Sequence, residues 1–319
     1  MIHVHDLRKA YRVSRRAGFM RRETIVVQAL DGLSFDMSRG EIVGYIGPNG
    51  AGKSTTIKVL AGILHPDSGD CEVDGRVPWK DRVAHVRGIG VVFGQRTQLW
   101  WDLPARDSLE LLGDMYGVPR DRAARTIAAL AAELELDPFI ETPVRQLSLG
   151  QRMRCELAAA LVHEPAMLFL DEPTIGLDAP SKLALRAFVR RLNRERGTTV
   201  ILTTHDMDDV EALAGRIVLI GRGRALFDGG FAELRRQGSG LKRIVADLAE
   251  PPPGGIVAPS GMRLEASAAG RAAFSYDPSV LPTGEALALV ARSFRVADLS
   301  VEGPPVEEVV AELYRRHGV

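Results

Sequence analysis

A glycine-rich segment near the start of the chain has the spacing that binds phosphate. It consists of Gly47, Pro48, Asn49, Gly50, Ala51, Gly52, Lys53, Ser54 and Thr55. Its glycines allow backbone amides to turn toward phosphate oxygens, with the positive end of a helix behind them. We expect Lys53 to reach the β- and γ-phosphates of a nucleotide and Ser54 to ligate Mg²⁺. The alternative, a glycine turn that holds no ligand, is disfavoured because a strand-like run precedes the segment and a helical pattern follows it.

Two acidic residues end an apolar run later in the chain. Residues 167–170 have the pattern of a short buried strand, and Asp171 and Glu172 follow directly. We expect Asp171 to hold Mg²⁺, while Glu172 aligns and deprotonates a water molecule. The phosphate loop alone leaves kinases, GTPases, helicases and transport ATPases open, so the other motifs must decide between these classes.

A third motif lies between the first two. The sequence Leu147-Ser148-Leu149-Gly150-Gln151 opens a helical run over residues 152–161. A serine and a glycine amide at a helix N-terminus form an anion site. That helix need not face the phosphate loop of its own chain.

The segments that position these motifs alternate between strand and helix patterns. Strand-like runs cover residues 2–13, 24–37, 41–46, 167–170 and 199–203. Helical patterns cover residues 54–63, a proline-punctuated block at 102–144, and residues 152–161 and 183–193. This alternation favours a parallel α/β core. Residues 8–22 hold seven basic residues and no acid, which suits a solvated hairpin loop or, less often, contact with anionic lipid or a partner.

The character of the chain changes after glycine- and proline-rich stretches at residues 238–240 and 251–255. Strand-like runs follow at residues 242–248, 262–266, 272–276 and 295–301, with helical patterns at residues 285–294 and 306–317. We therefore expect a domain of residues 1–237 and a small α+β domain of residues 238–319.

Composition excludes several classes of protein. With 319 residues, 45% of them apolar, the chain is long enough for about two globular domains. Forty-one basic residues balance forty-one acidic ones, so no overall field draws the chain to nucleic acid, and no nucleic-acid partner is expected. Cys71 and Cys155 are too few and too far apart for a disulfide framework or a zinc site, and no apolar run approaches the ~20 residues that span a bilayer. We expect a reducing, cytoplasmic location.

With these motifs in this order, residues from about 2 to 235 resemble the nucleotide-binding subunit of an ATP-binding cassette (ABC) transporter. The resemblance implies a P-loop ABC-type ATPase core with an antiparallel β region, and an inserted helical subdomain at about residues 96–160. It implies ATP and Mg²⁺ as the ligands, and hydrolysis of ATP as the reaction.

The same resemblance assigns roles to further residues. Tyr11 corresponds to the aromatic residue that stacks on adenine, and Gln95 to the glutamine that contacts Mg²⁺ and the attacking water. Ser148 and Gly150 correspond to the signature that closes over the γ-phosphate in the opposite protomer. Asp178 belongs to the loop that crosses the dimer interface, and His205 corresponds to the switch histidine on the γ-phosphate.

Some of these assignments have plainer alternatives. Tyr11 also suits an ordinary strand residue, and His205 an ordinary strand-end histidine. His65, His85 and His163 show no partner pattern and are assigned structural roles. Leu149 stands where glycine is usual; we expect its backbone to be helical, since a positive φ would strain leucine.

Trp100 and Trp101 follow Gln95 by five and six residues, beside the family's docking groove for membrane subunits. Exposed aromatic residues often anchor interfaces. The alternative is that both rings pack inside the helical block.

The resemblance implies a homodimer that sandwiches ATP, lies at the cytoplasmic face of the membrane and drives separate transmembrane permease subunits. Residues 296–309 resemble the end of ATPases in the drug-resistance branch of bacterial exporters, which favours export. An importer ATPase is the alternative within transport. From another class, a soluble ABC ATPase acting on DNA or ribosomes is less favoured, because such chains usually carry two cassettes, a long coiled coil or zinc-binding cysteines.

Overall fold

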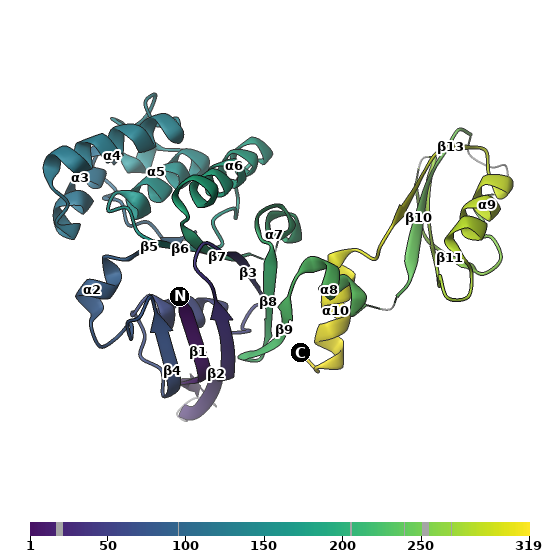
Figure 1. The fold of residues 1–319 in the computed structure, drawn as a ribbon, viewed down its shortest axis with the longest axis horizontal. Coiled ribbons are helices and arrows are strands. Elements are labelled where there is room, and N and C mark those ends of the chain that lie inside the picture. The colour runs from purple at the N-terminus through teal and green to yellow at the C-terminus, as the bar shows by residue number, and fades with distance from the viewer. Residues whose placement is uncertain (17–21, 95, 205, 239, 251–254, 269) are drawn as a thin grey trace. The chain divides into compact units, whose positions relative to one another are not determined.

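The computed structural model describes residues 1–16, 22–94, 96–204, 206–238, 240–250, 255–268 and 270–319. These residues form two compact units, Met1–Gly229 and Gly230–Val319 (Figure 1). The three chemical motifs all belong to the first unit. Gln95 and His205 lie outside the described residues, so their expected roles stay predictions.

A six-stranded sheet forms the centre of the first unit, in the order β5-β6-β7-β3-β8-β9. Its strands are β3 (Ile42–Ile46), β5 (Ile89–Phe93), β6 (Met167–Asp171), β7 (Thr199–Thr203), β8 (Arg216–Gly221) and β9 (Arg224–Gly229). All neighbours are parallel except β9, which runs antiparallel to β8. Because strand side chains alternate between faces, β6 places Leu168 and Leu170 in one core and Met167 and Phe169 in the other.

Helices cover one face of this sheet (Figure 1). They are α3 (Ala105–Tyr116), α4 (Arg120–Glu133), α5 (Leu149–Leu161) and α6 (Ala179–Arg196), with a 3₁₀ turn at Val144–Gln146. Their apolar faces form one continuous core with the sheet. Three shorter helices complete the unit: α1 (Lys53–Leu60), α2 (Arg82–Val86) and α7 (Met207–Leu213).

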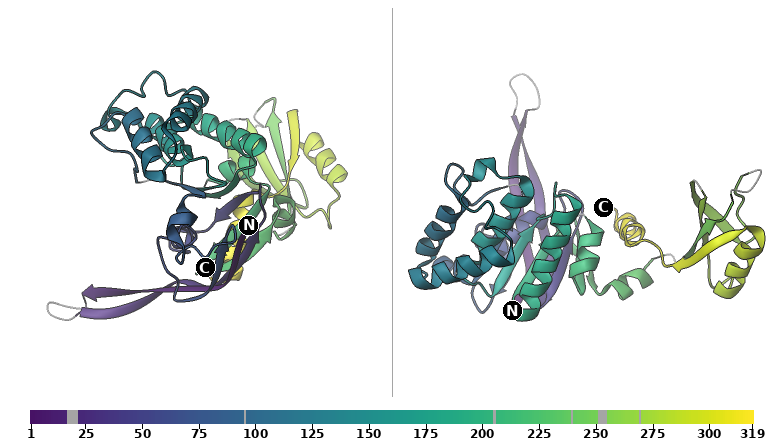
Figure 2. Two further views of the ribbon diagram at one scale, coloured as in Figure 1. Left: turned by 60° about the vertical axis from the view of Figure 1, so that its left-hand side comes forward. Right: turned by 90° about the horizontal axis from the view of Figure 1, so that it is seen from above.

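An antiparallel sheet, β2-β1-β4, lies on the other side. It consists of β1 (Ile2–Arg16), β2 (Arg22–Met37) and β4 (Ser68–Val73). Strand β4 pairs with β1 only as far as Arg8, whereas the pairing of β1 with β2 runs on to Arg16 and Arg22. The two strands therefore leave the sheet as a two-stranded ribbon that projects from the unit (Figure 2). Residues 17–21, inside the basic segment noted above, lie outside the described residues.

The second unit contains an antiparallel sheet in the order β11-β12-β10-β13. Its strands are β10 (Lys242–Leu248), β11 (Met262–Ala268), β12 (Arg271–Tyr276) and β13 (Val296–Glu302), and its helices are α8 (Phe231–Arg236), α9 (Thr283–Ser293) and α10 (Val306–Arg316). Helix α8 buries Leu234, and Gly238 lies close to Val309 of α10. Because α8 packs on α10, the compact unit begins at Gly230, whereas the sequence pattern places its boundary at residue 238.

The α/β class expected from the sequence is confirmed, and most predicted elements lie within a few residues of their observed bounds. Cys71 and Cys155 are buried free thiols, and burial raises the pKa of each to about 12. No helix among the described residues is both long and apolar enough to cross a membrane.

Candidate functional site

The glycine-rich segment joins β3 to α1, as the sequence predicts. Gly47 packs so closely that a Cβ added there would lie 2.8 Å from the backbone oxygen of Ile220. Gly52 has a φ of 108°, which only glycine adopts readily. The amide of Gly223 donates a hydrogen bond to the Ala51 carbonyl over 2.9 Å. The loop is therefore held by the turn between β8 and β9.

Lys53 is the first residue of α1 and only 7% exposed. Its Nζ donates to the carbonyl oxygens of Gly47 at 2.5 Å and Pro48 at 3.3 Å. Burial lowers the pKa of the Lys53 ammonium, and the negative charges of Glu172 and Asp171 oppose that shift. An ammonium group thus lies inside the loop, within the field of two carboxylates.

The first turn of α1 is open to an anion. No side chain caps it at Gly52, and Ser54 and Thr55 are its second and third residues. Uncapped amides at a helix N-terminus, together with the helix dipole, attract negative charge. The Gly52 carbonyl at the start of α1 is bound by Thr56. The Thr56 hydroxyl donates to this oxygen at 3.1 Å and contacts the hydroxyl of Tyr45 at 2.9 Å.

Asp171 ends β6 and meets hydroxyl groups from two other elements. Ser54 Oγ donates to Asp171 Oδ1 over 3.5 Å, and Thr203 Oγ1, at the end of β7, donates to the same oxygen over 2.6 Å. Residues far apart in the chain converge here because the carboxyl ends of parallel strands share one edge of the sheet. Ser54 and Asp171, the two residues expected to hold Mg²⁺, therefore lie together at this edge.

These oxygen donors fit Mg²⁺. Magnesium takes oxygen ligands, usually one or two from the protein with the rest from phosphates and water. Ser54 and Asp171 offer that set, and the described residues hold no cluster of three or more His, Cys, Asp or Glu side chains suited to a metal held by protein alone.

Glu172 follows Asp171 in an unusual backbone conformation. Its φ is 54°, in the left-handed region that favours glycine. Its amide donates to the Thr203 carbonyl at 2.9 Å and to Thr203 Oγ1 at 3.1 Å. Gly94 packs against it so closely that an added Cβ would lie 2.2 Å from the Glu172 oxygen. Contacts with both neighbouring strands therefore fix the backbone at this residue.

A cavity of about 260 Å³ lies at this edge of the sheet. It is lined by Ser54, Lys58, Ile63, Phe93, Gly94, Arg96, Asp171 and Glu172. Gly94 and Arg96, which flank Gln95 in the chain, both line this cavity, whereas Gln95 lies outside the described residues.

The motif at residues 147–151 forms the start of α5. Ser148 is the N-cap: its hydroxyl accepts from the Gln151 amide at 3.2 Å, and Gln151 Oε1 accepts from the Ser148 amide at 2.9 Å. This reciprocal capping box leaves Ser148 exposed. Leu149 is the first helical residue and its φ is not positive, which confirms the expectation of a helical backbone there. Its side chain lies over Gly176, where an added Cβ would come within 2.8 Å of Leu149 Cδ2.

Gly150 and Asp178 meet through Ser181. Asp178 is the N-cap of α6 and accepts from the Ser181 amide at 3.0 Å. The hydrogen bonds from Ser181 lower the pKa of the Asp178 carboxyl. A Cβ added at Gly150 would lie 2.6 Å from Ser181 Oγ. The signature motif and the loop before α6 are therefore packed together within one chain.

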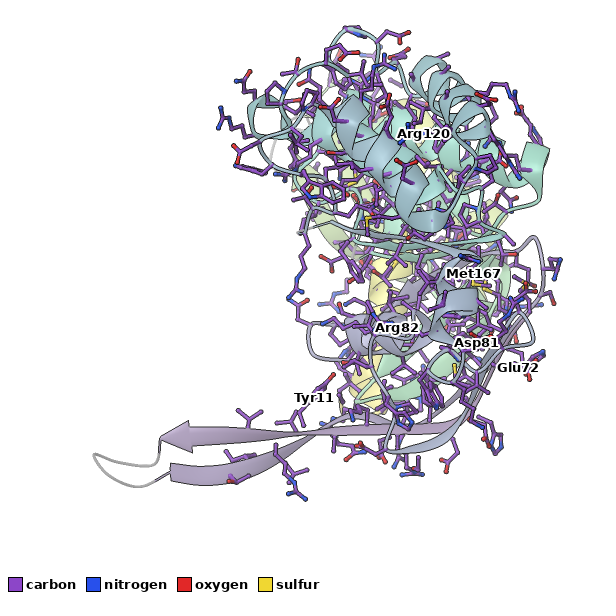
Figure 3. All side chains as sticks on the ribbon, turned by 90° about the vertical axis from the view of Figure 1, so that its left-hand side faces the viewer. Tyr11, Glu72, Asp81, Arg82, Arg120 and Met167 are labelled. Carbon is purple, nitrogen blue, oxygen red and sulfur yellow. The ribbon has the colours of Figure 1, made fainter. Side chains whose placement is uncertain are left out.

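Tyr11 lies on β1, opposite Val27, where the two-stranded ribbon leaves the sheet (Figure 3). It is partly exposed, as are Val26 and Val27 on the paired strand. This position suits a ring that stacks on a base, and it also suits an ordinary strand residue. The adenine-stacking role stays a prediction.

The tryptophan pair is exposed. Trp100 is 38% and Trp101 is 49% exposed, which argues against packing of both rings inside the helical block. The Trp100 amide donates to Ser108 Oγ at 3.1 Å, and the guanidinium of Arg152 lies 5.9 Å from the centre of the Trp101 ring. Arg152 stands on the first turns of α5, so the pair lies near the signature helix.

Three buried polar side chains of this unit were not identified from the sequence. Thr203 orients Asp171, buried Asp209 accepts from Thr174 and pairs with Arg186, and buried Glu156 holds the segment before the tryptophans. The last two carried a signal: an acidic residue on the apolar face of a helix needs a buried partner. The histidines assigned structural roles behave as expected, since His85 and His163 are held at backbone carbonyls.

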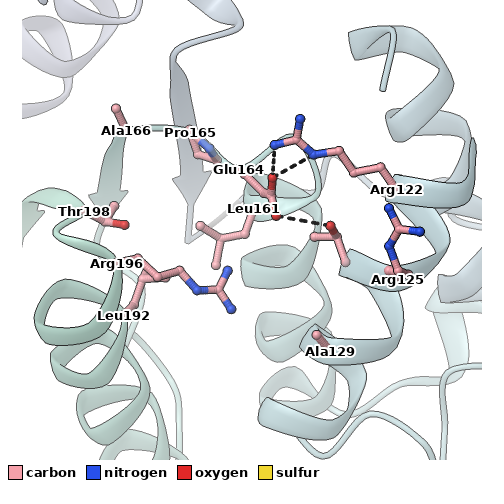
Figure 4. A pocket seen from close by; sticks show the side chains of 11 residues that line it. Arg122, Arg125, Ala129, Leu161, Glu164, Pro165, Ala166, Leu192, Arg196 and Thr198 are labelled. Carbon is pink, nitrogen blue, oxygen red and sulfur yellow. Dashed lines mark hydrogen bonds and ion pairs between the residues drawn. The ribbon is translucent and has the colours of Figure 1, made fainter. Parts of the chain in front are cut away.

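Another groove, of about 630 Å³, lies at the opposite ends of the strands of this sheet (Figure 4). Pro165 and Ala166 precede β6 and Thr198 precedes β7, so the groove is at the strand ends remote from Asp171 and Thr203. Glu164 in this groove pairs with Arg122 and accepts from the Thr126 hydroxyl. This groove is separate from the phosphate-loop site.

Comparisons with known proteins agree with this geometry. A family model described as ABC transporter matches residues 30–175. The chain is 34% identical over 209 residues to the ABC transporter ATP-binding protein NatA of Bacillus subtilis (strain 168), covering 66% of this chain and 85% of NatA. It is 39% identical over 213 residues to the daunorubicin resistance ATP-binding protein DrrA3 of Streptomyces coeruleorubidus, covering 67% of each. Among solved structures, it resembles the dimeric post-hydrolysis state of the ATP-binding cassette MJ0796 bound to ADP and Pi, with a TM-score of 0.60 and 26% identity over 72% of this chain and 98% of that one.

Proposed function

The chain belongs to the ATP-binding proteins of ABC transporters, and from that premise we propose that it powers the export of a substrate through separate transmembrane subunits. Members of this family bind ATP, and the chain is accordingly an ATPase. The proposal adds the direction of transport, the metal, the dimer and the role of each site residue.

The observation that carries the proposal is the convergence of Ser54 and Thr203 on one oxygen of Asp171, beside Glu172 and at the open end of α1. Ser54 and Asp171 are the residues that would hold Mg²⁺, which when bound would neutralise charge on the phosphates. Lys53 and the amides of the loop would bind the phosphate chain from the other side.

Glu172 is the proposed general base. It follows the metal-binding strand and lines the 260 Å³ cavity with Ser54 and Asp171, so it can orient a water molecule and accept its proton. The contacts with Thr203 and Gly94 fix the backbone from which this carboxylate extends. Gln95 and His205 are proposed, by resemblance, to contact the water and the γ-phosphate.

Export is favoured over import for two reasons. DrrA3, which is 39% identical over two thirds of each chain, is named a daunorubicin resistance protein. Residues 296–309 also resemble the end of ATPases in the drug-resistance branch. An importer ATPase remains the alternative.

A head-to-tail dimer is proposed to complete each ATP site. The MJ0796 cassette forms a dimer, and exposed Ser148 at the start of α5 offers a hydroxyl and helix amides to a second molecule. Mixed dimers test this arrangement, because Lys53→Ala and Ser148→Arg each disable both sites of their own homodimer. In a heterodimer both changes fall in one site and the other stays intact, so mixing the two inactive variants should restore part of the ATPase activity. No recovery, in a mixture shown to form heterodimers, contradicts the sandwich.

Purification from detergent-extracted membranes tests the transport role. We expect integral membrane proteins to co-purify with the chain at the membrane surface. Inside-out vesicles from the same cells should then accumulate the transported compound when ATP is added outside. Loss of the compound from loaded vesicles indicates import, and co-sedimentation with ribosomes or DNA instead of membrane proteins contradicts a role in transport.

A further inference from the structure

Glu156 is a carboxylate buried in the middle of α5. It is 3% exposed, and its helix neighbours Cys155, Leu157 and Ala158 are fully buried. A carboxylate is costly in such surroundings unless hydrogen-bond donors meet it. The buried carboxylate of Glu156 therefore requires hydrogen-bond donors. The residues that supply those donors show which part of the chain Glu156 holds in place.

Among the described residues, the hydrogen-bond donors to the Glu156 carboxylate come from one segment, just after β5. Thr97 Oγ1 donates to Glu156 Oε1, and the Gln98 amide donates to Oε2 over 3.3 Å. Gln98 Nε2 adds a hydrogen bond to the backbone oxygen of Glu156 over 3.2 Å. The Leu99 amide donates to Thr97 Oγ1 over 3.1 Å, so the hydroxyl that meets the carboxylate also shapes the next turn.

The rest of this segment is likewise held by the helical block. Leu99 is buried in the helical core, the Trp100 amide donates to Ser108 of α3, and the Trp101 carbonyl accepts from the Arg145 amide at 3.0 Å. In the part of the chain that the structure describes, Arg96 is the last residue of this stretch whose backbone is bonded to the sheet: its amide donates to the Phe93 carbonyl of β5 at 3.0 Å. Beyond it, the bond from Gln98 Nε2 to the Val91 carbonyl is long, at 3.5 Å.

We propose that Glu156 is a positioning residue that fastens residues 97–101 to α5, so that the exposed tryptophan pair and Ser148 move as one body. The inference rests on the proposed function, in which Ser148 meets nucleotide, and on the expectation from the sequence that the tryptophans meet a membrane subunit. Glu156 lies eight residues after Ser148, about 12 Å along a continuous helix. Movement of the helix start on nucleotide binding is thereby carried to Trp100 and Trp101.

The charge itself is informative. Burial raises the pKa of the Glu156 carboxyl, while the hydrogen bonds from Thr97 and Gln98 oppose the shift. Burial therefore disfavours the charged form, and the hydrogen bonds from Thr97 and Gln98 offset part of that cost, although an apolar side chain would suit the surrounding core. A role in holding the segment explains that cost.

Amide hydrogen exchange with and without Mg·ATP tests the inference, in a Glu172→Gln background that keeps nucleotide bound. In this parent, ATP should change exchange in residues 97–101 and 148–152 together. With Glu156→Gln, exchange at residues 98–100 should be about ten-fold faster without nucleotide, because hydrogen bonds to a charged group are lost. The ATP response should persist at residues 148–152 and disappear at residues 97–101.

Two further variants and one control make the result specific. Thr97→Val removes the hydroxyl from the other side of the pair and should uncouple the segment in the same way, even if Glu156→Gln fails to fold. Thr97→Ser keeps the hydroxyl and should behave like the parent. Glu141→Gln makes the same change of charge at an exposed site of the helical block and should alter neither response.

The outcomes separate the inference from the proposed function. If residues 97–101 respond to ATP in the Glu156→Gln and Thr97→Val variants as they do in the parent, Glu156 does not couple the segment. If the parent shows no ATP response at residues 148–152, the proposed role of Ser148 fails instead. If Thr97→Ser uncouples as fully as Thr97→Val, packing and not the hydrogen bond holds the segment.

Discussion

The hydroxyl of Thr203 donates a 2.6 Å hydrogen bond to Oδ1 of Asp171, from the end of one parallel strand to the end of its neighbour. The same hydroxyl accepts from the Glu172 amide at 3.1 Å. One buried threonine therefore orients the proposed metal ligand and the proposed base together.

Thr203→Val should lower ATPase activity or Mg²⁺ affinity about 10- to 100-fold, as loss of an outer-shell partner commonly does. Valine keeps the shape of the side chain, so the loss of stability should be near ~1 kcal/mol. Thr199→Val, at the other end of β7 and equally buried, is the matched control. The test is to measure the ATPase rate of both variants as a function of Mg²⁺ concentration. Equal effects of the two variants contradict the assignment of Thr203.

Glu172→Gln should remove most hydrolysis and leave ATP binding intact. An amide can hold a water molecule but cannot accept its proton, and loss of a general base typically costs ~10²–10⁴-fold. ATP should then trap a dimer that elutes earlier in size-exclusion chromatography. Turnover at the wild-type rate shows that Glu172 is not the base.

Trp100→Ala combined with Trp101→Ala should weaken association with membrane subunits and abolish transport, while the fold and basal ATP hydrolysis remain. Truncation of a well-buried interface aromatic commonly costs ~2 kcal/mol or more of binding energy. Trp79→Ala is the contrasting variant, since this ring packs against the core and should lower the melting temperature. Strong destabilisation by the Trp100/Trp101 pair contradicts the docking role.

The second unit should be dispensable for ATP binding, because the phosphate-loop site lies wholly within Met1–Gly229. A chain ending at Gly229 should bind ATP with wild-type affinity. A chain ending at Gly238 keeps α8 without α10, the helix on which it packs, and should aggregate more readily. Equilibrium binding of a fluorescent ATP analogue to both truncations measures this, and a folded Gly229 truncation that binds no nucleotide disproves the division.

Glu156 should make stability depend on pH. Its pKa is raised above 4.5 chiefly by burial, so the folded state holds the proton more tightly than the unfolded state. The stability this contributes is complete below pH 4.5 and is lost as the pH rises through the folded pKa. Relative to Glu156→Gln, the wild-type chain should lose free energy of unfolding as the pH rises from about 4.5 toward neutrality. Urea unfolding of both chains across that pH range tests this prediction. A difference in free energy of unfolding that does not change with pH contradicts it.

Local pattern was enough to predict the elements that carry the motifs. The run at residues 167–170 is short and apolar because both faces of β6 are buried. The segment at 47–55 matches the phosphate-loop pattern, which joins a strand to a helix. Leu149 was placed correctly because leucine resists a positive φ.

Long-range partners had no such local signal. Thr203 is one more β-branched residue at the end of a strand, and its bond to Asp171 depends on the order of strands in the sheet. The pairing of Glu156 with Thr97 joins residues 59 positions apart. The packing of α8 on α10, at the far end of the chain, joins residues 230–237 to the second unit, and no local pattern indicates that contact.

The left-handed backbone at Glu172 bears on how this chain can evolve. A non-glycine residue in that region costs ~1–2 kcal/mol, which glycine at the same position would recover. A copy released from ATP hydrolysis would gain stability if glycine replaced this glutamate, whereas most other side chains would meet the same strain. At position 172 the demand of catalysis and the preference of the backbone therefore oppose each other.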